Sequence, residues 1–143
     1  MPGRGWIGTD LPNLRPDVLT VMDPYSGEEL MAFPAIKPDV AVIHALKSDP
    51  EGNAIIGENK GVDEELLLTA KTVIVTTEEI VDELAKADLA APWVDAVVLA
   101  PNGALPTSCH PLYPLDGEAI LKYAETVSDP DSWKFYIDQL LRG

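Results

Sequence analysis

The loop that follows His44 carries the residue types of a ligand-binding site. Asp49, Gly52 and Asn53 come shortly after an apolar segment. Gly52 permits a backbone turn that other residues rarely adopt, and the amide of Asn53 can hydrogen-bond a carboxylate or a carbonyl group. Glu79 follows the next apolar run, so we expect it to lie close to this loop. We predict a substrate-binding role for these residues. The alternative is that the loop only shapes a turn.

The remaining reactive side chains lack the spacing of a metal or nucleophile site. His44 and His110 are far apart in the sequence, and no spacing of Cys and His typical of a metal site is present. His44 lies inside an apolar run, which is typical of a hydrogen-bonded core histidine. Cys109 and His110 are adjacent, but adjacent side chains diverge and seldom form a working thiolate pair. We therefore expect no metal site and no Cys–His nucleophile.

Three short apolar runs predict the buried β-strands that position these side chains. Each run lacks the polar alternation that a half-exposed strand would show. Strands that alternate with helices are typical of a parallel sheet, which binds ligands at the carboxyl ends of its strands. That rule points to the loops after Ala45, Val75 and Ala100. The expected strands cover residues 39–45, 72–75 and 95–100.

Capping residues predict where the helices between these strands begin. Asp63 is expected to cap a helix over residues 63–70. Thr76, with Glu79 three residues later, matches a capping box and predicts a helix over 76–85. The capping box also gives Glu79 a structural role as the alternative to substrate binding.

The two ends of the chain carry weaker signals. Residues 1–17 are rich in Gly, Pro and polar groups, so we expect an irregular lead-in or linker there and assign residues 18–143 to the folded part. A hairpin is expected over 18–33, because Pro and Gly are placed to reverse the chain in its middle. Asp116 and Asp129 are expected to begin two closing helices.

The composition excludes several classes of partner. The chain of 143 residues has a formal net charge of -14, and its basic residues form no stripe, which argues against nucleic acid and anionic membranes as partners. No apolar run approaches membrane-spanning length. A single cysteine allows no internal disulfide and no signal peptide is expected, so we predict a cytoplasmic protein.

Several segments, taken in order, resemble the A subunit of family I coenzyme A transferases, nearest to the glutaconate type. No single segment is decisive, but their order and spacing extend along almost the whole chain. Leu105 departs from the pattern, because the family often has His at this position. The chain is also much shorter than such a subunit, and it resembles the C-terminal half. The segments are residues 8–11, 23–28, 34–45, 47–53, 71–81 and 101–106.

The resemblance implies an incomplete α/β domain of the three-layer, parallel-sheet NagB/RpiA-like type. It implies that the chain supports transfer of coenzyme A from an acyl-CoA to a carboxylic acid, including dicarboxylic acids. Coenzyme A would be a substrate, and no tightly bound cofactor is expected. The catalytic Glu of this family lies on a partner B subunit, and the N-terminal half of the A subunit is a second implied partner. By this resemblance the chain itself carries no catalytic residue.

Glu58, which lies between Gly57 and Asn59, is similar to the nucleophile motif of the family. That motif belongs to the B subunit, whereas Glu58 lies in A-type sequence, so we interpret it as a solvated loop residue. Two other functions stay open. The chain could belong to an assembly that hydrolyses a CoA thioester or opens a ring, or it could be a non-catalytic interaction module.

Overall fold

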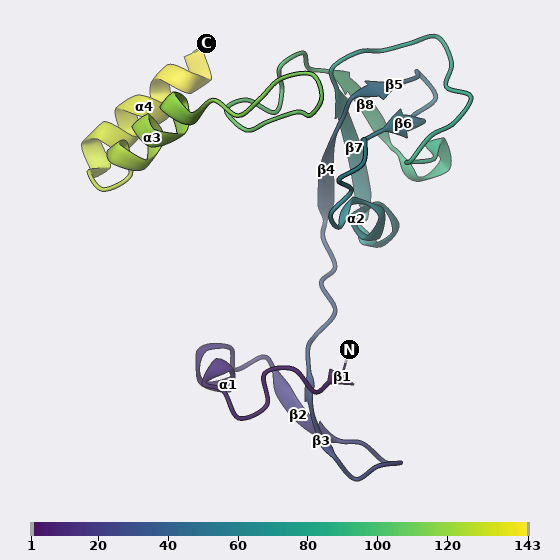
Figure 1. The fold of residues 1–143 in the computed structure, drawn as a ribbon, viewed down its shortest axis with the longest axis vertical. Helices are drawn as coiled ribbons and strands as arrows, with labels where there is room; N and C mark the ends of the chain where they lie inside the picture. Colours follow the sequence, from purple (N-terminus) through teal and green to yellow (C-terminus); the bar gives the residue numbers. More distant parts are fainter. Residues whose placement is uncertain (1, 143) are drawn as a thin grey trace. The chain divides into compact units, whose positions relative to one another are not determined.

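The computed structural model describes residues 2–142 and divides the chain into two compact units (Figure 1). The first unit ends at Lys37 and the second begins at Pro38. The sequence predicted a boundary after residue 17 instead. The two boundaries differ because residues 2–3 pair with the hairpin that follows, so that the lead-in and the hairpin form one unit.

The first unit is a small antiparallel sheet. Its strands are β1 (Pro2–Gly3), β2 (Leu19–Met22) and β3 (Glu29–Ala32), in the order β1-β3-β2, and α1 (Leu11–Leu14) connects β1 to β2. Gly27 has a positive φ of 71° in the turn between β2 and β3, a conformation that favours glycine. The predicted hairpin is therefore confirmed. The lead-in contains a strand and a short helix that the sequence did not predict.

The second unit is built on a parallel sheet, which confirms the predicted α/β class. Its strands are β4 (Val40–Ala45), β7 (Thr72–Thr77) and β8 (Ala96–Leu99), in the order β4-β7-β8. Val42 lies opposite Ile74, and Ile74 lies opposite Ala96. β4 and β8 fall within the apolar runs expected to form them, whereas β7 begins where it was expected and extends two residues past the predicted end.

One face of the parallel sheet carries the core of the second unit. Alternate residues of β4 and β7 point toward this face, as the two-residue period of a strand requires. The helix α2 (Asp63–Thr69) and the hairpin of β5 (Lys47–Ser48) and β6 (Ala54–Ile55) contribute to it. The buried cluster comprises Ala41, Ile43, Ala45, Ala54, Leu67, Val73, Val75 and Leu89.

The helix predicted over residues 76–85 is wrong. Thr76 and Thr77 end β7, and the chain from 78 to 90 is irregular. Long-range contacts satisfy its backbone instead: Ser48 N–H donates to the Glu79 carbonyl at 3.0 Å, and Val81 N–H donates to the Ser48 carbonyl at 2.9 Å. Partners far away in the sequence therefore replace the local bonds of the predicted capping box.

The other predicted helices are present, with one correction to their caps. The Asp116 side chain accepts the Ala119 N–H at the start of α3 (Gly117–Thr126), and Asp129 accepts the Ser132 N–H at the start of α4 (Pro130–Arg142). Asp63 does not cap α2, because it is already the first helical residue. A short 3₁₀ helix, η1 (Ala91–Trp93), precedes β8. Among residues 2–142, no helix has the length and apolarity that crossing a membrane requires.

Candidate functional site

The loop predicted to bind substrate is organised around the buried carboxylate of Asp49, which is 1% exposed. Its Oδ1 accepts the N–H groups of Gly52 at 3.1 Å and Asn53 at 2.9 Å, and its Oδ2 accepts Asn53 Nδ2 at 2.8 Å and Leu84 N–H at 3.2 Å. Burial alone would raise the pKa of Asp49, but these hydrogen bonds together hold it below its usual value. The structure thus brings three of the four predicted residues together.

The contacts of Asn53 and Gly52 tie this loop to η1 and to Val94, which follows η1. Asn53 Oδ1 accepts the Ala91 N–H at 3.1 Å. Gly52 has a φ of 106°, and a Cβ atom placed there would lie 3.1 Å from Val94 Cβ. The turn that Gly52 was predicted to permit is confirmed. A substrate-binding role for the loop stays a prediction.

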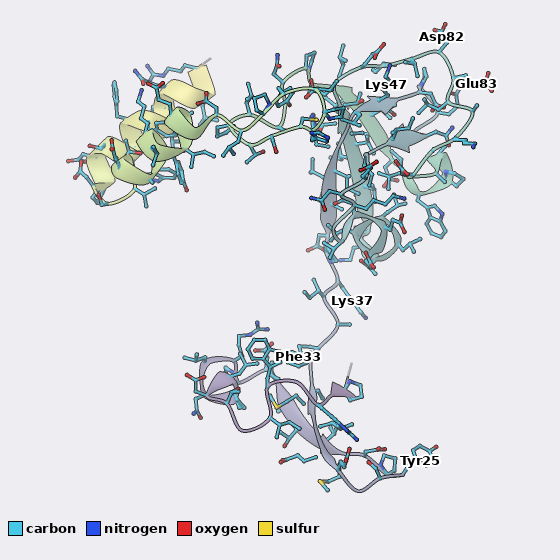
Figure 2. The ribbon with its side chains drawn as sticks, viewed as in Figure 1. Tyr25, Phe33, Lys37, Lys47, Asp82 and Glu83 are labelled. Carbon is cyan, nitrogen blue, oxygen red and sulfur yellow. The ribbon has the colours of Figure 1, made fainter. Side chains whose placement is uncertain are left out.

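Glu79 lies beside this loop, but its carboxylate points elsewhere. The side chain is 55% exposed and pairs with Lys47 at 2.7 Å, while its backbone carbonyl accepts the Thr77 hydroxyl at 3.0 Å. The loop borders a hollow of about 280 Å³ that is lined by Asp49, Glu51, Asn53, Asp82, Glu83 and Leu84. Figure 2 shows Asp82 and Glu83 on the connection between β7 and β8. An anionic substrate group in this hollow would meet several carboxylates and no cation among the lining residues.

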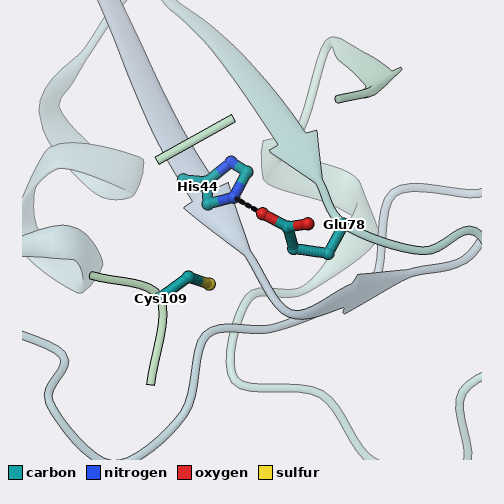
Figure 3. A group of neighbouring side chains, drawn as sticks. All are labelled: His44, Glu78 and Cys109. Atoms are coloured by element: carbon teal, nitrogen blue, oxygen red, sulfur yellow. Dashed lines mark hydrogen bonds and ion pairs between the residues drawn. The ribbon is translucent and has the colours of Figure 1, made fainter. Parts of the chain in front are cut away.

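A second polar cluster lies at the carboxyl ends of β4 and β7, centred on Glu78 (Figure 3). Glu78 Oε1 lies 2.8 Å from His44 Nε2 and accepts the hydroxyl of Tyr113, and Oε2 accepts the Asn102 N–H at 2.7 Å. His44 Nδ1 lies 2.8 Å from Thr76 Oγ1. The prediction that His44 is hydrogen-bonded is confirmed, but its side chain is 20% exposed and borders a cavity, so His44 is not part of the core.

The network sets the protonation of its members. Burial raises the pKa of Glu78, but the hydrogen bonds from Tyr113, the Asn102 N–H and His44 outweigh it and leave this pKa below its usual value. Burial and the hydrogen bond to Glu78 raise the pKa of Tyr113 to about 12. At neutral pH a carboxylate therefore holds a neutral tyrosine, and together they fix the loop after β8 to the end of β7.

Cys109 lies beside this network as a buried thiol. A ring nitrogen of His44, a carboxylate oxygen of Glu78 and the Sγ of Cys109 all lie within 4.8 Å of one another. These three atoms could serve as the nitrogen, oxygen and sulfur ligands of a metal site. Both nitrogens of His44 and both oxygens of Glu78 already have hydrogen-bond partners, however. Burial and the charge of Glu78 raise the pKa of the Cys109 thiol. The arrangement is that of a hydrogen-bonded network with a protonated thiol, which does not favour thiolate nucleophilic chemistry.

A cavity of about 570 Å³ adjoins the network at the end of β4. The segment after β6 forms one wall, and the loop after β8 forms another. Glu58 and His110 are exposed, and for Glu58 this agrees with the solvated loop position that the sequence predicted. The ionisable and nucleophilic side chains that line the cavity are His44, Glu58, Asp63, Ser108, Cys109 and His110.

Sequence reasoning missed Glu78 and Tyr113. Only two threonines separate the pair Glu78–Glu79 from the apolar run that ends at Val75, which places both carboxylates near the carboxyl end of a strand. The predicted capping box placed Glu79 in the first turn of a helix and gave Glu78 no role. Because β7 continues to Thr77, Glu78 is the residue that turns toward β4 and Glu79 is the exposed one.

Comparisons with known proteins agree with this fold and arrangement. A family model described as malonate decarboxylase, alpha subunit, transporter matches residues 17–125. The A subunit of the 3-oxoadipate CoA-transferase of Pseudomonas knackmussii is 36% identical over 144 residues, which cover 98% of this chain and 51% of that protein. The crystal structure of glutaconate coenzyme A-transferase from Acidaminococcus fermentans superposes with a TM-score of 0.87 at 29% identity, covering 97% of this chain and 51% of that chain. This chain belongs to the family I coenzyme A transferases, as an A-subunit sequence.

Other similar proteins show how varied the chemistry around this family is. The cholesterol ring-cleaving hydrolase IpdA subunit of Rhodococcus jostii is 32% identical over 158 residues, covering 100% of this chain and 53% of that protein. The crystal structure of a variant of the decarboxylase AibA/AibB has a TM-score of 0.85 at 36% identity, covering 100% of this chain and 53% of that chain. The chain thus spans about half the length of each of these four proteins.

Proposed function

We propose that this chain is part of the A subunit of a coenzyme A transferase, which moves coenzyme A from an acyl-CoA to a carboxylic acid. The observation that carries the proposal is the 36% identity to the A subunit of a 3-oxoadipate CoA-transferase over 98% of the chain. Dicarboxylic acids are the first acceptors to test, because the similar transferases are named for 3-oxoadipate and glutaconate. Coenzyme A is a substrate in this proposal.

The nucleophile of the proposed reaction is a Glu carboxylate of the partner B subunit. This carboxylate attacks the thioester carbonyl, which releases the CoA thiolate and leaves an acyl-glutamyl anhydride. The thiolate then attacks the glutamyl carbonyl, so that the first acid leaves as a carboxylate and a glutamyl thioester forms. The acceptor carboxylate repeats the two steps in reverse and leaves as the new acyl-CoA.

This chain would contribute one wall of the site rather than the nucleophile. The cavity of about 570 Å³ lies where parallel sheets place ligands, next to the carboxyl ends of the strands. The network around Glu78 holds the loop that forms one of its walls, which keeps His110 and Ser108 at the cavity. Glu58 and Asp63 also line the cavity, so its surface is acidic. The positive potential that an acyl carboxylate and the CoA phosphates require would come from the partner chains.

The test is a transfer assay on the reconstituted complex. The chain is co-expressed with a B-type subunit and with the half of an A-type subunit that it does not span. Acyl-CoA is supplied with several mono- and dicarboxylic acids, and formation of the new acyl-CoA is followed by chromatography. Transfer to at least one acid supports the proposal. An assembled complex that transfers coenzyme A to none of them would contradict it.

Glu58 provides a control on where the nucleophile lies. Glu58→Ala should leave transfer largely unchanged if the nucleophile is on the B subunit. The matched change Glu64→Ala, on the exposed side of α2, measures the effect of removing a carboxylate away from the cavity. A loss of more than about a hundredfold at Glu58 alone would place the nucleophile in this chain.

A hydrolase is the second candidate, because the IpdA subunit of Rhodococcus jostii is 32% identical over the whole chain. In that case water would replace the acceptor carboxylate. The same assay distinguishes the two, since a hydrolase releases free coenzyme A or opens its substrate's ring without any added acid. Stoichiometric transfer that depends on the acceptor would exclude the hydrolase.

A further inference from the structure

Three side chains of the polar network have the chemistry and the spacing of metal ligands (Figure 3). His44 lies on β4, Glu78 follows β7 and Cys109 lies in the loop after β8, and their ligand atoms are all within 4.8 Å of one another. One tetrahedral ion requires ligand atoms about 3.3–3.6 Å apart, given bonds of about 2.0–2.3 Å. His44 Nε2 and Glu78 Oε1 are 2.8 Å apart, so small shifts of the side chains would complete the geometry.

Most hydrogen bonds of the network are compatible with a bound ion. The contact of His44 Nδ1 with Thr76 Oγ1 at 2.8 Å, and the bond from the Asn102 N–H to Glu78 Oε2 at 2.7 Å, use the ligand atoms that would not face the ion. Metal sites use such bonds to orient their imidazole and carboxylate ligands. Tyr113 can keep donating to Glu78 Oε1, because a carboxylate oxygen has two lone pairs. Only the direct contact between His44 and Glu78 would be replaced.

The charge of the cluster and its access to the cavity also favour a cation. A carboxylate and a thiolate, with a neutral imidazole, balance the charge of one divalent ion. The chain as a whole has a net charge of -14, which attracts cations. Cys109 is buried, but both His44 and Cys109 line the cavity of about 570 Å³. The cavity therefore gives an ion a path to the three ligands.

We propose that His44, Glu78 and Cys109 bind one Zn²⁺ ion, whose fourth coordination position faces the cavity. Zn²⁺ accepts nitrogen, oxygen and sulfur ligands in a tetrahedral arrangement, whereas Mg²⁺ and Ca²⁺ prefer oxygen ligands alone. When the ion binds, the Cys109 thiol gives its proton to solvent and its sulfur bonds to the metal. The sequence predicted no metal site, because the ligands come from three separate segments. The site goes beyond the proposed transfer, which runs through carboxylates alone.

Cobalt absorption tests the proposal on the full chain. The chain is freed of metal with EDTA and titrated with Co²⁺, a spectroscopic substitute for Zn²⁺. We expect one tightly bound ion per chain and a cobalt–thiolate charge-transfer band in the near ultraviolet. Because Cys109 is the only cysteine, no other residue can produce this band, so the result does not depend on any variant. Added Zn²⁺ should displace Co²⁺ and remove the band.

Variants then identify the ligands. Cys109→Ser should abolish the band, and Cys109→Ser and His44→Gln should each weaken Zn²⁺ binding at least about tenfold in competition with a chromophoric chelator. His110→Gln is the matched control, because His110 is exposed and lines the same cavity but is not one of the three ligands. Its affinity for Zn²⁺ should stay within about twofold of the unchanged chain. Zn²⁺ should also raise the midpoint of thermal unfolding in His110→Gln but not in Cys109→Ser.

Several results would overturn the proposal. One is the lack of a charge-transfer band at saturating Co²⁺. Another is an equal loss of affinity in Cys109→Ser and His110→Gln. Binding of several ions that Cys109→Ser leaves unchanged would assign them to the acidic surface instead. These measurements need no partner chain, so their outcome is independent of the transfer assay.

Discussion

The hydroxyl of Tyr113 donates a hydrogen bond to Glu78, a residue 35 positions earlier in the chain. The contact joins the loop after β8 to the carboxyl end of β7, and the backbone N–H of Asn102 binds the other oxygen of the same carboxylate. One side chain therefore holds both ends of the loop that borders the cavity. The stability of this loop should depend on the charge of Glu78.

Glu78→Gln should lower the free energy of unfolding by about 2 kcal/mol. The glutamine amide has no negative charge to strengthen the hydrogen bonds that the carboxylate accepts, and its NH2 group would face one of the groups that now donate to Glu78. The measurement is equilibrium denaturation by urea. Glu79→Gln is the matched control and should cost less than about 1 kcal/mol, since the Glu79 carboxylate is 55% exposed and pairs with Lys47 at the surface. Equal effects of the two changes would contradict the central role of Glu78.

Alkaline pH should destabilise the protein through Tyr113. Its pKa is raised from 10.0 to about 12, so between these values the folded state keeps a proton that the unfolded state has lost. Stability therefore falls as pH rises through this window, by up to about 2–3 kcal/mol. The Tyr113→Phe variant should not show this loss of stability at alkaline pH. The control variant Tyr25→Phe, changed at an exposed position, should still show it. Identical pH dependence of the two variants would contradict the shift.

Gly52→Ala should destabilise the chain by more than about 1 kcal/mol, because alanine is strained at a φ of 106° and its Cβ would crowd Val94. Gly117→Ala is the control: its Cβ would meet nothing within 4 Å at the start of α3. Thermal unfolding of both variants measures the difference. A Gly52→Ala chain as stable as the control would mean that the loop relaxes to accept the side chain.

Asn53→Ala should lower the free energy of unfolding by about 1–3 kcal/mol, because it removes the amide that bonds Asp49 and leaves the Ala91 N–H without that acceptor. Asn13→Ala, at an exposed position of α1, is the control. Transfer activity per mole of folded complex then tests the predicted substrate role, which requires a further loss of at least about tenfold. Unchanged activity of the folded fraction would leave Asn53 with a purely structural role.

Local sequence patterns were sufficient to predict the strands of the parallel sheet and the starts of the two C-terminal helices. The apolar runs around Val42, Val75 and Val97 predicted the strands of the parallel sheet, and Asp116 and Asp129 marked the starts of α3 and α4. These features could be predicted because they depend on residues within a few positions of one another: the composition of a short run, or a side chain that caps the next N–H groups.

The conformation of the segment after β7, and which of its carboxylates joins the polar network, depend on contacts between distant parts of the chain. Thr76 and Glu79 have the spacing of a capping box, but hydrogen bonds between Ser48 and the backbone of residues 79–81 keep this segment irregular. That change turns Glu78 toward His44 and leaves Glu79 at the surface. The contacts of Glu78 join residues 34 and 35 positions apart, and a pattern confined to neighbouring residues carries no information about them.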